Sequence, residues 1–201
     1  MHYCQECETP VLMQPRGDVA VCPVGHGEEP AKRQPLFVVT GASGAGKTGV
    51  FPFLAAELRE CVVFDVDWLI DPFELACAPE PINWVAFRDG WLSVAHGVAQ
   101  GDRATVLLSP FMPEQLHDLP ARPWFTEIHF ALLDCTDTTR LTRLGKRPDW
   151  RDRNSGQQLA FAEHLRTRIP TVVRTDDGTP AEAATALASW VRGVLGPRTT
   201  S

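Results

Sequence analysis

Long apolar runs are missing from this sequence. No segment approaches the roughly 20 apolar residues that a membrane-spanning helix needs, and the first residues, MHYCQECETP, lack the basic start and the apolar core of a secretory signal. An excess of basic residues is missing too, because 19 Lys and Arg stand against 25 Asp and Glu, a net charge of −6. Proteins that bind nucleic acids usually present a basic face. We therefore expect a cytoplasmic protein with neither a membrane nor a nucleic acid as its partner.

The first 33 residues are poor in large apolar side chains but rich in potential metal ligands. Two closely spaced pairs of ligands are present: Cys4, Cys7, Cys22 and His26. The segment between the pairs is typical of a β-hairpin that turns at residues 15–18, which would bring both pairs to one tetrahedral zinc site. Metal binding would supply much of the folding energy of a head this short. We expect structural zinc, with free thiols as the alternative and with His2 as a rival to His26 for the fourth position.

The remaining cysteines, Cys61, Cys77 and Cys135, are expected to be packing residues, because disulfides are rare in the cytoplasm. Residues 27–35, GEEPAKRQP, are polar and bounded by proline, which is typical of a linker. We therefore expect a head over residues 1–33 and a second domain over residues 34–201.

Beyond the linker, short apolar runs alternate with longer amphipathic segments. The runs are rich in β-branched residues and apolar on both faces, as expected for strands covered on both sides; they span residues 36–40, 61–65, 105–109, 128–134 and 171–175. The helical segments span residues 46–60, 84–100, 138–144, 159–167 and 180–195. This alternation predicts an α/β fold with a parallel sheet and right-handed crossovers.

The segment GASGAGKT fits the pattern G-x-x-x-x-G-K-[ST] of a phosphate-binding loop, and it lies between a predicted strand and a predicted helix. Glycines let such a loop curl so that its backbone N–H groups point at phosphate oxygens, and the helix adds the positive end of its dipole. Lys47 would reach the β- and γ-phosphates of a nucleotide, and Thr48 would place its hydroxyl on Mg²⁺. The alternative is a glycine-rich turn that matches by accident. The predicted nucleotide-binding residues are Gly41, Ala42, Ser43, Gly44, Ala45, Gly46, Lys47, Thr48 and Gly49.

Two aspartates, Asp65 and Asp67, end the second apolar run. Alternation along a strand would send both side chains to the same face, at the carboxyl end where open α/β sheets bind ligands. One carboxylate would hold Mg²⁺, and the other would accept a proton from an attacking hydroxyl. A solvated turn is the alternative interpretation. The phosphate loop one strand earlier makes us favour the functional one.

The segments TGASGAGKT, FDVDWL and RLTRLGKRPDWR together resemble small P-loop kinases of the shikimate kinase, gluconate kinase and chloramphenicol phosphotransferase type, which are related to adenylate kinases. The resemblance covers residues 36–195. It implies a three-layer αβα P-loop NTPase fold with five parallel strands. It also implies that the second carboxylate of the pair contacts the acceptor hydroxyl and that the first lies nearer the metal. These roles would belong to Asp67 and Asp65, in an order that the sequence leaves open.

Basic residues concentrate in RLTRLGKRPDWRDR, residues 140–153. In a kinase of the resembled type, a mobile lid closes arginines over the transferring phosphoryl group, where they neutralise charge and exclude water. We expect this lid at about residues 140–158. Arg143 and Arg147 are the main candidates because they are one helical turn apart. The alternative is a solvated basic helix end that the helix dipole favours.

Aromatic residues follow the aspartates, in the region that holds the acceptor in the resembled kinases. They are Trp68, Phe73, Trp84, Phe87 and Trp91. We predict acceptor contacts from Trp68 and Phe87, and Arg88 as an anchor for an anionic or hydroxyl-bearing acceptor. The spacing of Trp84, Phe87, Trp91 and Val94 also fits a core stripe of a helix, which is the more ordinary explanation for most of them.

The sequence as a whole predicts a small-molecule kinase, a phosphotransferase that depends on ATP and Mg²⁺. Its acceptor would be a hydroxyl or phosphate of a metabolite, a nucleoside or nucleotide, or an antibiotic-like molecule. The third apolar run, residues 105–109, ends without an acidic residue that could hold Mg²⁺, so we assign this role to Asp65 or Asp67. GTP is not distinguished from ATP. The alternative function is a non-catalytic nucleotide sensor or adaptor whose zinc head binds a partner.

Overall fold

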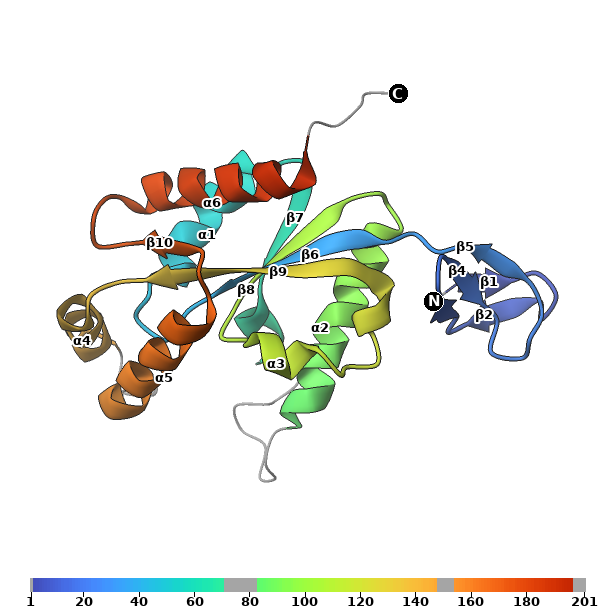
Figure 1. Cartoon of the computed structure of the whole chain (residues 1–201), viewed down its shortest axis with the longest axis horizontal. Coiled ribbons are helices and arrows are strands. Elements are labelled where there is room, and N and C mark those ends of the chain that lie inside the picture. Colours follow the sequence, from blue (N-terminus) through green and yellow to red (C-terminus); the bar gives the residue numbers. More distant parts are fainter. Residues whose placement is uncertain (1, 71–82, 148–153, 197–201) are drawn as a thin grey trace.

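A computed structural model describes residues 2–70, 83–147 and 154–196, apart from the side chains of residues 2 and 3. It consists of an α/β body and a small β head at one end of it (Figure 1). The body contains a five-stranded, wholly parallel sheet in the order β10-β9-β6-β8-β7. The strands are β6 (Gln34–Thr40), β7 (Cys61–Asp65), β8 (Ala104–Ser109), β9 (Phe125–Asp134) and β10 (Val172–Arg174). The predicted five-stranded α/β architecture is confirmed.

Helices cover both faces of this sheet. The α-helices are α1 (Lys47–Glu57), α2 (Trp84–Ala99), α3 (Pro113–Leu116), α4 (Asp137–Gly145), α5 (Ser155–Arg168) and α6 (Pro180–Leu195). The 3-10 helix η1 (Val66–Leu69) follows β7, and the 3-10 helix η2 (Arg122–Trp124) precedes β9. Helices α1 and α6 lie on one face, and α2 and α3 lie on the other (Figure 1).

The central strand β6 shows why both faces are covered. Its residues alternate between two apolar clusters, since Phe37 and Val39 pack with α1 and α6 whereas Leu36 and Val38 pack with α2. All four side chains are fully buried. A strand that is apolar on both faces therefore needs a helical layer on each side, which is the pattern that the sequence predicted.

The head consists of two small antiparallel sheets. In the first, β1 (His2–Cys4) pairs with β2 (Thr9–Val11). In the second, β4 (Val19–Val21) pairs with both β3 (Gln14–Arg16) and β5 (Glu28–Pro30). The predicted hairpin is present as β3–β4, with Gly17 at a φ of 55° in its turn. The prediction that residues 27–35 form only a linker is wrong, because β5 completes the second sheet.

The head joins the amino end of β6, whereas the phosphate-loop segment follows the carboxyl end of the same strand (Figure 1). Buried Ala20, with Met13 and Ala31, extends the apolar cluster of the α2 face into the head. Lys32 Nζ donates to the Gln100 carbonyl at 3.0 Å and pairs with Asp102 at 3.1 Å. The head is thus held against the end of the sheet that lies away from the phosphate loop. Among the described helices, none is long and apolar enough to cross a membrane.

Candidate functional site

The loop between β6 and α1 requires glycine at particular positions. A Cβ atom on Gly41 would lie 2.5 Å from the Leu133 carbonyl oxygen of the neighbouring strand, so no larger residue fits there. Gly44 and Gly46 have φ angles of +84° and +102°, a conformation that residues with a side chain rarely adopt. These three glycines let the chain pass close to β9 and then curl into the first turn of α1.

The curled loop leaves backbone donors without partners. Helix α1 begins at Lys47, and its N-cap residue, Gly46, has no side chain to cap it. In the described part of the chain, the backbone N–H groups of Gly44, Gly46, Lys47 and Thr48 have no hydrogen-bond acceptor. Unpaired N–H groups at a helix N-terminus, together with the helix dipole, form a site for an anion. The loop therefore has the donor set that a phosphate group needs.

A hollow of about 280 Å³ opens beside this loop. Within the described ranges, four chain segments contribute to its wall: the phosphate loop with the start of α1, η1, the residue after β8, and the end of α4 with the residues that follow it. The lining residues are Ser43, Gly44, Ala45, Gly46, Lys47, Thr48, Gly49, Asp67, Pro110, Arg143 and Arg147. The structure thus brings together most of the predicted nucleotide-binding residues, one aspartate of the pair and both candidate arginines.

Lys47 is held at the base of the hollow, where its ammonium donates to the Gly41 carbonyl. Burial lowers the pKa of Lys47 to about 8, and the carboxylates of Asp67 and Asp65 oppose this shift. The two aspartates therefore lie close enough to act on the lysine electrostatically. An anion in the hollow would act in the same direction as they do.

Asp65 and Asp67 take different positions. Asp65 ends β7, is 6% exposed, and accepts the Asp67 N–H at 3.1 Å, which starts the 3-10 helix η1. Asp67 is then the carboxylate that lines the hollow. The prediction that strand alternation directs both side chains is wrong, because the strand ends at Asp65 and the next residues are helical. Asp65 acts as the cap that positions Asp67.

Arg143 links the phosphate loop to the segment after β10. Its Nη1 donates to the Gly44 carbonyl at 3.1 Å and to Thr175 Oγ1 at 2.8 Å, and its Nη2 donates to the Thr175 carbonyl at 2.8 Å. Thr175 Oγ1 in turn donates to the Ala45 carbonyl at 2.7 Å. Arg147, beyond the end of α4, lines the same hollow. Of the predicted lid, residues 148–153 lie outside the described part of the chain.

Arg140 has a structural position instead. Its guanidinium is fully buried, donates to the Ser43 carbonyl at 3.0 Å and pairs with Asp134 at the end of β9. Asp134 also pairs with Arg166 at 2.8 Å and Arg174 at 3.3 Å. This buried carboxylate therefore joins α4, α5 and β10 beneath the phosphate loop.

Sequence reasoning missed two residues that contact the loop, Gln158 and Thr175, and it missed Asp134, which acts on the loop through Arg140. Gln158 Oε1 accepts the Ser43 N–H at 2.9 Å. Asp134 ends an apolar run just as Asp65 does, so the same end-of-strand rule would have identified it. Gln158 and Thr175 give no such local signal, because their partners lie far away in the chain.

The aromatic residues after the aspartates are divided between core and surface. Trp91 is buried against Phe64, with ring centroids 5.5 Å apart, whereas Trp84 and Val94 are 44% and 39% exposed. The core-stripe interpretation is therefore wrong for Trp84 and Val94. The buried residues of α2 are Trp91, Leu92, Ala95, His96 and Ala99.

The three predicted acceptor contacts do not line the hollow. Trp68 is 55% exposed and packs edge-on against Phe51, with ring centroids 5.0 Å apart. Phe87 packs against Phe111, beside the lining residue Pro110. Arg88 has a buried Nε without a partner in the described residues, and burial lowers its pKa. Phe73 lies in residues 71–82, outside the described ranges.

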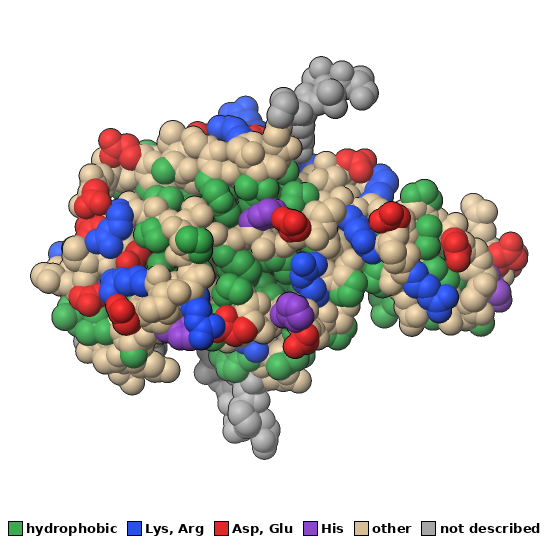
Figure 2. Space-filling model, viewed as in Figure 1, with side chains coloured by type: hydrophobic (Ala, Val, Ile, Leu, Met, Phe, Trp, Pro, Cys, Tyr) green, Lys and Arg blue, Asp and Glu red, His purple; other side chains and the backbone are tan. Residues whose placement is uncertain are grey.

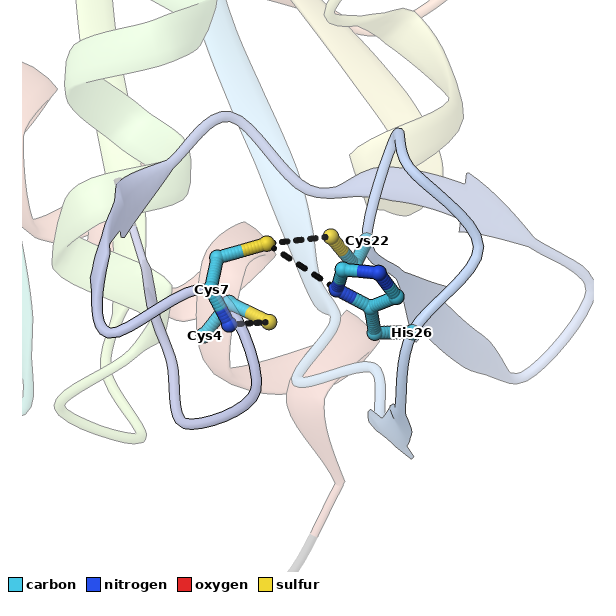
Figure 3. Close-up of side chains that lie close together, drawn as sticks. All are labelled: Cys4, Cys7, Cys22 and His26. Carbon is cyan, nitrogen blue, oxygen red and sulfur yellow. Dashed lines mark hydrogen bonds between the residues drawn. The ribbon is translucent and has the colours of Figure 1, made fainter.

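A second candidate site lies in the head, where Cys4, Cys7, Cys22 and His26 point toward one another (Figure 3). Their ligand atoms all lie within 4.8 Å of one another. Cys7 Sγ is 3.6 Å from Cys22 Sγ and 3.1 Å from His26 Nδ1. Tetrahedral zinc with Zn–S bonds of about 2.3 Å separates its sulfur ligands by about 3.8 Å, so this cluster has the size that such an ion needs.

Burial and hydrogen bonding shift the pKa values of two of these thiols in opposite directions. Burial, followed by the neighbouring Cys4 and Cys22, raises the pKa of the Cys7 thiol to about 12. A hydrogen bond from the backbone of Val24 lowers the pKa of Cys22. A divalent cation favours the thiolate form of its cysteine ligands. The side chain of the rival ligand His2 lies outside the described part of the chain.

No protein-family model and no curated protein matches this sequence. Solved structures match its fold. A sugar kinase from Janibacter sp. HTCC2649 has a TM-score of 0.56 at 21% identity, over 79% of this chain and 94% of that chain. A shikimate kinase from Aquifex aeolicus has a TM-score of 0.54 at 14% identity, over 82% and 100%. A gluconokinase from Sinorhizobium meliloti 1021 has a TM-score of 0.52 at 18% identity, over 82% and 97%. The predicted resemblance to small P-loop kinases is confirmed at the level of the fold.

Proposed function

We propose that this chain is a small-molecule kinase that transfers a phosphoryl group from ATP to an acceptor hydroxyl or phosphate. One observation carries the proposal: unpaired backbone donors, Lys47, Asp67 and the two arginines meet at one hollow. Phosphoryl transfer needs positive groups around the phosphates and a carboxylate at the acceptor, which are the groups gathered here. The shared fold with proteins described as sugar kinase, gluconokinase and shikimate kinase supports the same class of reaction.

Each group would have a distinct task. The loop N–H groups and Lys47 would bind the β- and γ-phosphates, and Arg143 and Arg147 would neutralise charge that develops on the transferred group. Asp67 would orient the acceptor hydroxyl and take its proton. Thr48, with Asp65 or Asp67, would hold Mg²⁺, which would neutralise phosphate charge when bound. Trp68, Phe87 and Arg88 would contact the acceptor outside the hollow.

An ADP-release assay tests this proposal. The full chain with ATP and Mg²⁺ is screened against pooled nucleosides, sugars and aminocyclitols, and we expect one pool to stimulate ADP release. Asp67→Asn should then lower the rate by about 100-fold or more, because the base is lost. Asp118→Asn is the matched control, since that carboxylate is 92% exposed and lies outside the site; it should leave the rate unchanged.

The two functions that the sequence allows give different results. If ATP binds but no acceptor stimulates ADP release, the nucleotide sensor is supported instead. If ATP does not bind, and Lys47→Met gives the same absence of binding as the wild type, both the kinase and the nucleotide-sensor interpretations of the hollow fail.

We further propose that Cys4, Cys7, Cys22 and His26 hold a structural zinc ion. The size of the cluster and the cysteine-rich donor set support zinc. The head offers little core of its own, since the buried apolar residues among its described side chains are Cys4, Ala20, Val21 and Cys22. A metal ion would therefore contribute a large part of its folding free energy.

A further inference from the structure

Strand β9 is much longer than the strand that pairs with its outer edge. It runs over Phe125–Asp134, but β10 pairs only with residues 132–134. Apart from the pairing with β6, no backbone hydrogen bond between described residues involves residues 126–131. About half of β9 is therefore an open edge of the sheet.

The direction of the open backbone groups follows from the paired part of the strand. Leu132 N–H donates to the Thr171 carbonyl at 2.8 Å, and the Asp134 carbonyl accepts from Thr175 N–H at 2.9 Å, both on the β10 side. Backbone groups alternate along a strand, and the β6–β9 register is regular from Ile128 to Leu132. Ile128 and Phe130 therefore direct their N–H and C=O groups outward.

Apolar and polar side chains alternate along this edge. Glu127 and His129 lie on the α6 face, where His129 stacks on Phe37, with ring centroids 5.4 Å apart. Glu127 is 72% exposed, with Oε2 3.4 Å from His129 Nε2. Ile128 and Phe130 are half-buried on the other face. The β9 side of the sheet faces the reader in Figures 1 and 2, and apolar side chains are exposed at the middle of this view, between charged groups.

We propose that this edge pairs with the same edge of a second copy of the chain, antiparallel and about a two-fold axis at Ile128. Open strand edges are templates for added strands, and a two-fold axis makes the pairing self-complementary. The result would be one continuous sheet through both copies. This inference is independent of the proposed kinase function.

Charge decides the register. With the backbone N–H and C=O groups of Ile128 and Phe130 directed outward, a two-fold axis can lie at Ile128 or at His129. An axis at His129 would set two histidines opposite each other and Glu127 opposite Ala131. An axis at Ile128 sets Glu127 of each copy opposite His129 of the other, so both carboxylates meet an imidazole N–H. Glu127 and His129 would form a non-hydrogen-bonded pair, in which opposed side chains approach most closely. Their attraction would therefore stabilise the register with the axis at Ile128.

The pairing is short, because the β6–β9 register shifts just before Ile128. We therefore expect a weak, concentration-dependent dimer. Sedimentation velocity of the full chain over a range of micromolar concentrations should show a monomer–dimer equilibrium. Glu127→Lys and His129→Glu should each weaken it by about tenfold or more, because the first removes both carboxylates from the imidazole N–H groups and the second places carboxylates opposite each other.

An equimolar mixture of these two variants should restore the dimer, because the lysine introduced in one chain then opposes the glutamate introduced in the other. Ile128→Pro should abolish pairing without removing a β6 hydrogen bond, because the N–H of residue 128 faces outward. Circular dichroism checks that each variant folds. A wild-type chain that is monomeric at every concentration would overturn the proposal, and so would a dimer that all three single variants retain.

Discussion

At the scale of single residues, Lys47 sets the electrostatics of the hollow. Burial disfavours its charged form, while Asp67 and Asp65 favour it, and the balance leaves its pKa at about 8. An unperturbed lysine keeps its proton far above neutral pH. At pH values above this pKa, the lysine would gain a proton when an anionic ligand binds.

This pKa predicts how ATP affinity depends on pH. Phosphate charges favour the ammonium form, so bound ATP raises the pKa of Lys47 above 8. Below pH 8 the free protein is already protonated at this position, but above pH 8 binding must take up a proton. Affinity should therefore fall as pH rises from about 8 to about 9.5, by up to about tenfold per pH unit.

Isothermal titration calorimetry across this range measures the effect. Lys47→Arg is the matched control, because its guanidinium stays charged throughout, and it should flatten the profile. An unchanged affinity in the wild type between about pH 7 and about 9.5 would show that Lys47 does not titrate there.

At the scale of elements, the buried carboxylate of Asp134 joins parts of the fold that the sequence separates. It pairs with Arg140 of α4, Arg166 of α5 and Arg174 of β10, and Arg140 also holds the Ser43 carbonyl of the phosphate loop. The fully buried guanidinium of Arg140 depends on this partner, because an unpaired charge away from water is strongly destabilising.

Removing that partner should be costly. Asp134→Ala should lower the free energy of unfolding by about 3–5 kcal/mol, since it leaves Arg140 buried without its counter-ion. Urea denaturation followed by circular dichroism measures the change, with the exposed Asp118→Ala as a control that should not shift the midpoint. A loss below about 1 kcal/mol would mean that water or another acceptor replaces the carboxylate.

The strands and helices themselves were largely predictable, because apolar periodicity is a local property of the chain. The predicted boundaries of β7 and α6 match the structure, and that of β8 differs by one residue. The prediction for β9 began three residues late, at Ile128, because Thr126 and Glu127 are polar and exposed there. Edge residues of this kind lose the apolar signal of a buried strand.

At the scale of the whole molecule, the head joins the amino end of β6, whereas the phosphate loop follows its carboxyl end (Figure 1). The hollow is lined by that loop, so it lies at the end of the sheet away from the head. The head contacts the body through Ala20 and through Lys32, whose ammonium donates to the Gln100 carbonyl at the end of α2. It does not contribute to the wall of the hollow. This arrangement predicts that the head and the nucleotide site act separately.

Loss of zinc should therefore leave nucleotide binding intact. Cys22→Ser should abolish the zinc content that elemental analysis measures, while ATP affinity stays within about twofold of the wild type, because such distant sites without shared partners act independently. Cys61→Ala is the control that should keep its zinc, since Cys61 lies in β7. A parallel loss of ATP binding would instead show that the head supports the hollow through the sheet.

By itself, the sequence determined the alternation of strands and helices, the phosphate loop and the ligand pairs of the head, because spacing and glycine pattern are properties of neighbouring residues. Only the tertiary structure decided that Asp67 lines the hollow while Asp65 caps the helix η1, and that Arg140 is buried while Arg143 holds the loop. It alone brought Gln158 to Ser43, 115 residues away, and Thr175 to Ala45, 130 residues away. Such contacts depend on where the sheet places the ends of its strands, and no short stretch of the chain encodes that placement.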